Sequence, residues 1–196
     1  MRIAKFRELS GDAAVLSGAP RGQEVFSKLI KAALSEPSSP EAIFLDFTGV
    51  EVATASYLRE SVLAFRDFVR GRRSMLYPVV ANANPVIQEE LRELLKFRGD
   101  AIMTCTLTAE GEVSESGLLG NLEPKQRITY DLVLKKGETD AGELMRDLGN
   151  TEGMQHTTAW NNRLSSLAAL GIVVEMTKGR TKRYRPLFAG GPRDGN

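Results

Sequence analysis

The chain has 196 residues, of which 42% are hydrophobic and 26% charged, a composition typical of a globular protein with one large or two small domains. It contains no run of 18 apolar residues, so we expect no membrane span. One cysteine and one histidine exclude an internal disulfide, a cysteine-based zinc site and a multi-histidine metal site. The first residues lack the long apolar segment of a secretory signal, and we expect a protein of the reducing cytoplasm.

The net charge of +1 is unevenly distributed. Residues 1–122 hold 14 Lys/Arg and 16 Asp/Glu, a net charge of −2, whereas residues 123–196 hold 12 and 9, a net charge of +3. Five basic residues and no acid fall within eight positions near the C-terminus. These are Lys178, Arg180, Lys182, Arg183 and Arg185. The small net charge therefore hides one basic element.

Helix and strand patterns alternate along the first 108 residues. An almost continuous apolar run is typical of a central strand covered on both faces of its sheet, and it occurs at residues 42–47. Strands are expected at residues 3–6, 13–16, 42–47, 75–80 and 101–107, and helices at 22–34, from 56 onward and from 85 onward. The first two strands are expected to flank a turn, and Asn84-Pro85 to begin the last helix. The alternation predicts an α/β layer with crossover connections, extended by a hairpin-like tail up to a boundary near residue 122.

Residues 123–196 follow a different pattern. Helices are expected at residues 124–136, from Thr139 or Asp140 to Leu148, and at 157–170, followed by hairpin strands at 172–176 and 183–187. The first helix is expected to bury Ile128 and Leu132, with Val133 as a further candidate. In the third helix, apolar side chains recur on one face, which predicts the core residues Trp160, Leu164, Leu167 and Ala168.

Three short helices followed by a β-hairpin, within about 65 residues, is the order of a winged helix-turn-helix. Residues 157–173, TTAWNNRLSSLAALGIV, resemble the recognition helix and the following strand of winged-helix DNA-binding domains. Gly179 to Tyr184, followed by Pro186, resembles the wing. The resemblance covers residues 124–188 and implies binding to double-stranded DNA.

The residues themselves point the same way. Uncharged hydrogen-bonding side chains on the outer face of the third helix can pair with base edges in a major groove. The N-terminus of that helix offers backbone N–H groups to a phosphate, and a basic hairpin can follow the DNA backbone. The candidate DNA-binding residues are Gln155, His156, Thr157, Thr158, Asn161, Asn162, Ser165, Lys178, Arg180, Lys182 and Arg183. Two alternatives remain open, a solvated helix face with an exposed basic hairpin, and a winged-helix domain that binds protein.

Residues 43–58, IFLDFTGVEVATASYL, resemble the centre of STAS domains, the fold of anti-sigma-factor antagonists. An apolar strand ends in Asp-apolar-Thr, Gly-Val follows, and a turn containing Thr and Ser opens a helix. The resemblance covers residues 1–108 and implies an α/β sheet-and-helix fold with a partner-binding surface at Thr54, Ser56 and Tyr57. The serine that partner kinases phosphorylate in STAS proteins is replaced here by Ala55, so the phosphorylation switch does not carry over.

Several polar groups have structural interpretations. Thr54 and Ser56 lie where a strand meets a helix and are expected to cap that helix. Asp46 is expected to accept hydrogen bonds from loop N–H groups, and Cys105 to be an inert core residue. The sequence contains neither a phosphate-binding loop nor a nucleophile elbow. We therefore expect no enzyme activity, no catalytic residue, no metal site and no cofactor.

The fold class expected from these observations is α/β, with a STAS-like domain at residues 1–122 followed by a small winged-helix domain at residues 123–196. The expected function is that of a cytoplasmic transcriptional regulator of a bacterial or phage-related locus. Its first domain binds a protein partner or a ligand, or forms a homodimer, and its second binds duplex DNA. The alternative is a partner-switching adaptor in which both domains bind protein.

Overall fold

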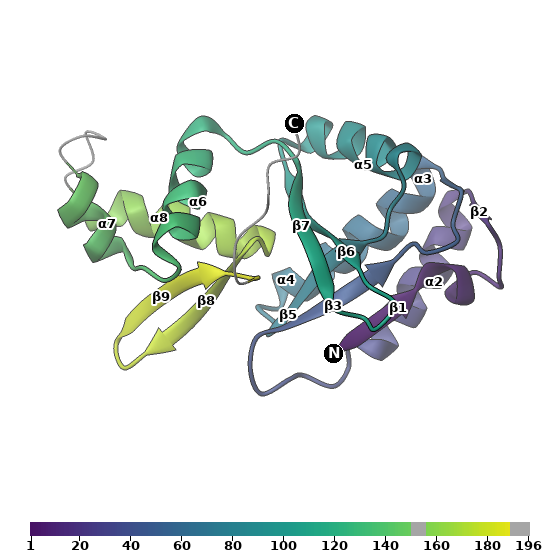
Figure 1. The fold of residues 1–196 in the computed structure, drawn as a ribbon, viewed down its shortest axis with the longest axis horizontal. Coiled ribbons are helices and arrows are strands. Elements are labelled where there is room, and N and C mark those ends of the chain that lie inside the picture. The colour runs from purple at the N-terminus through teal and green to yellow at the C-terminus, as the bar shows by residue number, and fades with distance from the viewer. Residues whose placement is uncertain (150–155, 189–196) are drawn as a thin grey trace. The chain divides into compact units, whose positions relative to one another are not determined.

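A computed structural model of the chain describes residues 1–149 and 156–188. The chain divides into two compact units, one made of Met1–Asn121 and one that begins at Leu122. Each unit combines helices with strands, which places the protein in the mixed α/β class (Figure 1). Within the described residues, no helix is both long enough and apolar enough to cross a membrane.

The first unit is built on a five-stranded sheet of order β1-β3-β5-β6-β7 (Figure 1). Its strands are β1 (Arg2–Lys5), β3 (Glu41–Asp46), β5 (Leu76–Ala81), β6 (Ala101–Leu107) and β7 (Val113–Gly120). The first four are parallel, and β7 pairs antiparallel with β6. Strand β3 lies between two neighbours and β5 is buried throughout, as continuous apolar runs predict. The hairpin-like tail expected at residues 110–121 is confirmed as β7.

The first two predicted strands exist but do not pair with each other. Strand β1 pairs with β3, whereas β2 (Val15–Leu16) pairs in parallel with β4 (Val52–Ala53) in a separate two-stranded sheet. Between them the chain forms a helical turn, α1 (Phe6–Leu9). This turn buries the Phe6 ring completely and stacks it 4.4 Å from the Phe47 ring. Burial of this aromatic ring, which local alternation cannot reveal, accounts for the helical turn.

Helices connect the parallel strands of the first unit. They are α2 (Ala19–Ala32), the continuous segment α3 (Ala55–Leu58), η1 (Arg59–Leu63) and α4 (Ala64–Gly71), and α5 (Pro85–Arg98). The predicted start of α5 is confirmed, because the Asn84 side chain accepts a hydrogen bond of 3.0 Å from the Ile87 N–H. Helix α2 packs on η1, and α4 packs on β5.

Two polar clusters lie in this unit. The expected role of Asp46 is confirmed, since its Oδ1 accepts hydrogen bonds from the Thr48 N–H at 3.0 Å and the Asn82 side chain at 2.9 Å. Deeper in the unit, the Arg66 guanidinium of α4 makes a two-point contact with the Asp100 carboxylate at 3.0 and 2.5 Å. Arg66 also donates to the Ala101 carbonyl at 3.0 Å, which ties α4 to the start of β6.

The second unit contains the three helices and the hairpin that the sequence predicts. They are α6 (Pro124–Lys136), α7 (Ala141–Leu148), α8 (Thr157–Leu170), β8 (Val173–Lys178) and β9 (Thr181–Pro186). Strands β8 and β9 pair antiparallel. The four apolar side chains predicted for the core of α8 are all buried: Trp160, Leu164, Leu167 and Ala168.

Helix α6 buries only one of the three side chains expected in its core, Val133. Ile128 is 38% exposed, and Leu132 is only half-buried. The buried side chains are Thr129, Tyr130 and Val133. A threonine is tolerated in this stripe because its hydroxyl donates to the Lys125 carbonyl at 2.8 Å, so no polar group is left unsatisfied.

One residue between α6 and α7 pairs with the hairpin like a short third strand. The Thr139 N–H donates to the Tyr184 carbonyl at 2.9 Å, and the Tyr184 N–H donates to the Thr139 carbonyl at 2.8 Å. Thr139 thus pairs with β9 directly before α7, which begins at the cap of Asp140. The bridge fixes α7 against the hairpin, and sequence periodicity gave no signal for a one-residue strand.

Candidate nucleic-acid interface

Three elements of the second unit border one open groove of about 740 Å³, which we name the α8 groove. Helix α8 contributes Thr157, Asn161 and Ser165. The hairpin contributes Arg180, Thr181 and Lys182, and α7 contributes Arg146 near its end and the turn at its beginning. The structure therefore brings predicted site residues from the helix and from the hairpin to the same place.

The helical repeat explains which side chains α8 presents. Thr157, Asn161 and Ser165 recur every fourth residue and form a stripe beside the buried one. Thr158 and Asn162 are exposed farther round the helix and do not border the groove. The Ser165 hydroxyl lies 3.2 Å from the Tyr184 hydroxyl and shares a hydrogen bond with it, so part of its hydrogen-bonding capacity is used within the fold.

The residues just before α8 contribute differently. His156 is exposed, occupies the N-cap position and forms no capping hydrogen bond through its side chain. It does not border the α8 groove. Gln155, the other candidate in this stretch, lies outside the described residues.

The tip of the hairpin presents an arginine. Strands β8 and β9 are joined by Gly179 and Arg180, and Gly179 has a φ of 63°, a left-handed conformation that glycine adopts without steric cost. Arg180 is exposed and makes no ion pair with the residues that the structure describes. Its guanidinium is therefore available to an anion in the α8 groove.

The other predicted cations of the hairpin have intramolecular partners. Lys178 lies 2.9 Å from Glu138, and Lys182 lies 2.7 Å from Glu175. Both side chains are more than half exposed, at 64% and 51%. Exposed pairs of this kind are weak, so a phosphate can compete for either lysine, but it must displace a carboxylate to do so.

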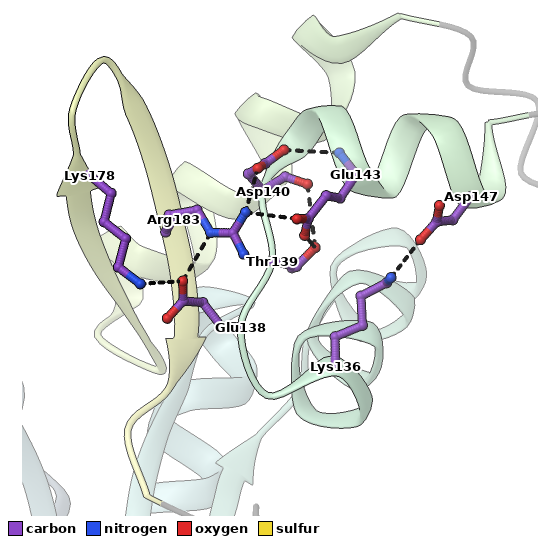
Figure 2. A network of polar contacts seen from close by, with 8 residues as sticks. All are labelled: Lys136, Glu138, Thr139, Asp140, Glu143, Asp147, Lys178 and Arg183. Carbon is purple, nitrogen blue, oxygen red and sulfur yellow. Dashed lines mark hydrogen bonds and ion pairs between the residues drawn. The ribbon is translucent and has the colours of Figure 1, made fainter.

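Arg183 corrects the sequence-based expectation. Figure 2 shows its guanidinium enclosed by three carboxylates, those of Glu138 at 3.0 Å, Asp140 at 2.8 Å and Glu143 at 2.8 Å. The Arg183 side chain is only 22% exposed, and its role is to fix the α6–α7 connection to β9. The local sequence contains no acid, but the fold supplies three from about 40 residues upstream.

This Arg183 cluster keeps its carboxylates ionised. Hydrogen bonds from Lys178 and Arg183 lower the pKa of Glu138, and the hydrogen bond from Arg183 lowers the pKa of Glu143. Burial opposes ionisation of Asp140, but the Glu143 N–H and Arg183 outweigh it and lower the pKa of that group too. The same contacts raise the pKa of Arg183. At neutral pH the cluster therefore consists of charged groups that largely neutralise one another.

Tyr57 is not exposed on the partner surface that the sequence predicts for the first unit. Tyr57 is fully buried, its ring packs edge-on against Phe6 at 6.3 Å, and its hydroxyl lies 2.7 Å from that of Ser10. It is a core residue and does not present its ring to a partner. Tyr57 and its neighbour Leu58 are both buried, so they form the inner face of α3.

Thr54 and Ser56 are half-buried, and the expected capping role is only partly correct. Thr54 occupies the N-cap position of α3, but neither side chain makes a capping hydrogen bond. The Thr54 hydroxyl instead accepts from the Gly18 N–H and contacts the Ser56 hydroxyl, each at 3.3 Å. These hydroxyls therefore tie the turn to the start of α2.

Arg146 borders the α8 groove, although no sequence pattern marks it as a site residue. It is the one basic residue of α7, it is exposed, and it forms no ion pair with any described residue.

Within the described residues, no group of three or more His, Cys, Asp and Glu is placed to hold a metal ion. Burial raises the pKa of Cys105 to about 12, so this thiol is protonated at neutral pH and a poor nucleophile.

A scan against protein-family models finds no match to this chain, and a search of curated proteins also finds no match.

Proposed function

We propose that the second unit binds duplex DNA, with α8 in the major groove and the hairpin tip against the backbone. The protein is then a transcriptional regulator whose first unit binds a partner or a ligand, or dimerises. The observation that carries the proposal is the convergence of uncharged side chains of α8 and of Arg180, which has no ion pair among the described residues, on one groove. The order of three helices and a hairpin supports it, because this order resembles a winged helix.

Each group has a role in this proposal. The Asn161 amide, with a donor and an acceptor side by side, can pair with the N6 and N7 atoms of an adenine. Arg180 and Arg146 can each contact a phosphate, which positions the helix without specifying the sequence. Asn162 and Thr158, exposed next to this stripe, can contact neighbouring bases or phosphates.

The ion pairs of the hairpin predict weak electrostatic binding. The dependence of affinity on salt follows the number of phosphates that the protein neutralises. With Arg146 and Arg180 as the available cations, we expect log K to change with log salt at a slope of roughly −2, against roughly −4.5 for five free cations. Sequence-specific contacts by α8 must then supply much of the affinity.

The deciding experiment measures fluorescence anisotropy of the full-length protein on two duplexes, one selected from a random-sequence pool and one of random sequence. Asn161→Ala is expected to lose about 1–3 kcal/mol on the selected duplex and almost nothing on the random one. Arg180→Gln is expected to weaken both equally and to reduce the salt slope by roughly 1.

Arg127→Gln is the matched control, because Arg127 pairs with Asp131 on α6 and does not border the α8 groove. It removes the same charge from the same unit and is expected to bind both duplexes nearly as the wild type does. Equal binding of the selected duplex by the wild type and Asn161→Ala would contradict base recognition by this stripe.

One observation favours a second candidate, a protein-binding adaptor. Carboxylates of the chain itself neutralise Lys178, Lys182 and Arg183. A surface balanced in this way also suits a protein partner with mixed charge. Absence of salt-dependent duplex binding at about 50 mM salt, where electrostatic binding is strong, would exclude the DNA-binding function and leave the adaptor.

A further inference from the structure

The first unit contains a concave site of about 390 Å³ that none of the functions above uses, which we name the α2 groove. The segment from α1 to β2 forms one wall, and one face of α2 forms the other. Tyr57 of α3 also borders it. This volume lies within the range of small-molecule sites, which is roughly 300–1,000 Å³.

The helical wall of the α2 groove is basic at both ends. Arg21 and Lys28 are seven positions apart, so they lie on one face of α2 two turns from each other. Arg21 forms no ion pair or hydrogen bond with the residues that the structure describes. The Lys28 Nζ donates one hydrogen to the Leu9 carbonyl at 2.5 Å, which leaves two of its three hydrogens for a ligand.

A pair of hydroxyls adds a further donor between the two walls. The Ser10 and Tyr57 hydroxyls lie 2.7 Å apart and share one hydrogen bond. Two hydroxyls carry two hydrogens, so the pair retains one hydrogen for another acceptor. Burial raises the pKa of Tyr57, which keeps its hydroxyl protonated and neutral at physiological pH.

Apolar side chains complete the site. Leu9 and Ala13 lie on the loop wall, whereas Leu16 and Val25 are buried at the base of the groove. Glu24 is the single acid among the lining residues, against two cations. Donors outnumber acceptors beside an apolar base, and this chemistry selects a ligand with an apolar body and an anionic head.

We propose that the α2 groove binds a small organic anion, with its head group at Arg21, Lys28 and the Ser10–Tyr57 hydroxyl pair. The apolar body of the ligand packs on Leu16 and Val25. This site lies wholly within the first unit, and the proposal does not rest on DNA binding by the second. A ligand there contacts α1, α2 and α3 together, and its binding stabilises the arrangement of these helices.

The test uses the full-length, ¹⁵N-labelled protein and follows amide chemical shifts during titration with phenylacetate. We expect shifts at Ser10, Gly11, Ala13 and along residues 21–28. Phenylethylamine and 2-phenylethanol keep the apolar body but lack the negative charge, and we expect each to bind at least roughly tenfold more weakly. Phenyl phosphate shows whether the site prefers a carboxylate or a phosphate head.

Variants then locate the head group. Arg21→Gln together with Lys28→Gln is expected to weaken phenylacetate binding by roughly tenfold or more. The matched control is Lys31→Gln together with Arg59→Gln, which removes the same charges from exposed positions that do not border the groove. Glu24→Gln is expected to strengthen binding severalfold, because it removes the like charge beside the anion.

Three results would overturn the proposal. The first is that none of the four probes shifts the amides of the groove. The second is that 2-phenylethanol binds as tightly as phenylacetate, which would leave only an apolar surface. The third is unchanged phenylacetate affinity in the Arg21→Gln/Lys28→Gln variant while its spectrum shows a folded first unit.

Discussion

Arg66 in the first unit and Arg183 in the second both bind carboxylates from distant parts of the chain, but they do so at different depths. The Arg66 side chain is 3% exposed and that of Asp100 is 7% exposed. Arg183 is 22% exposed, and its three acidic partners are between 15% and 31% exposed. Similar chemistry therefore operates in a dry environment in one unit and at a partly hydrated surface in the other.

The difference in depth gives the two arginines different roles. A buried charge that loses its buried partner regains little hydration, so Arg66 and Asp100 depend strongly on each other, although each also contacts a more exposed charge, Asp67 and Arg98 respectively. A partly exposed charge regains much of its hydration, so the Arg183 cluster contributes less to stability. Its larger effect is on the surface, because it uses carboxylates and cations that would otherwise face a ligand of the second unit.

The largest expected effect is that of Arg66→Met, which removes the buried guanidinium from Asp100 and leaves this carboxylate only the partly exposed Arg98, 3.5 Å away, as a cationic partner. We expect the first unit to lose about 3–5 kcal/mol of its free energy of unfolding. Urea unfolding of the full chain, followed by circular dichroism, measures this loss. Trp160, the single tryptophan, is buried in the second unit. The unfolding transition that its fluorescence reports should therefore have the same midpoint as in the wild type.

The double variant Arg66→Met/Asp100→Leu tests the reason for that loss. If the cost comes from the loss of the buried partner of Asp100, removing this carboxylate as well should restore much of the stability. An equally unstable double variant would show that Arg66 acts mainly through its packing and its bond to the Ala101 carbonyl.

The same contrast explains how far the sequence predicts the structure. The strands of the five-stranded sheet, the helices of the second unit and the buried stripe of α8 all follow from periodicity and helix ends, which are local signals, whereas the short strand β4 was not predicted. Arg66 carries no such signal. It lies on an amphipathic helix, and its partner Asp100 is 34 residues away, so only the packed fold brings the two together.

In the candidate site too, features that depend on one helix were predicted, whereas features that depend on contacts between distant residues were not. Helical spacing correctly predicted that Thr158, Asn161 and Asn162 point outward, because that depends on one helix alone. The availability of Arg183 depended on acids near residue 140, and the participation of Arg146 depended on how α7 meets α8. The prediction that Tyr57 faces a partner was wrong for a similar reason, because Phe6 from a distant part of the chain packs against its ring. Charges and aromatic rings in a site therefore require the tertiary structure.

Arg183→Gln sharpens the comparison, because it removes the partly exposed arginine from its cluster. We expect the second unit to lose on the order of 1 kcal/mol, clearly less than the first unit loses in Arg66→Met. The midpoint of urea unfolding reported by Trp160 fluorescence measures it. Arg127→Gln, which breaks a single exposed pair with Asp131, should cost only a few tenths of a kcal/mol. A loss as large as that of Arg66→Met would show that exposure does not separate the two arginines.

Acid should weaken the second unit through the Arg183 cluster. Folding lowers the pKa values of Glu138, Asp140 and Glu143, so their stabilising effect is complete above their ordinary values of 4.5 and 3.8. It is lost as the pH falls through the lower folded values. We expect the unfolding midpoint followed by Trp160 fluorescence to fall between about pH 5 and pH 3, and to fall less steeply in Arg183→Gln. Parallel curves for the two proteins would contradict this linkage.

The smallest expected effect concerns ligand binding and rests on the proposed DNA-binding function. Glu138 accepts from both Lys178 and Arg183, so Glu138→Gln releases Lys178 and weakens the hold on Arg183. If the hairpin contacts phosphates, this loss of one carboxylate should tighten binding of random and selected duplexes alike, by a few-fold, and steepen the salt slope by roughly 1. Asp131→Asn is the matched control, because it removes a negative charge from the same unit at a position that pairs with Arg127 on α6. Equal tightening by both variants would mean that only the net charge of the unit matters. No tightening by Glu138→Gln would mean that Lys178 does not reach the DNA, which would leave Arg180 and Lys182 as the hairpin cations that border the α8 groove.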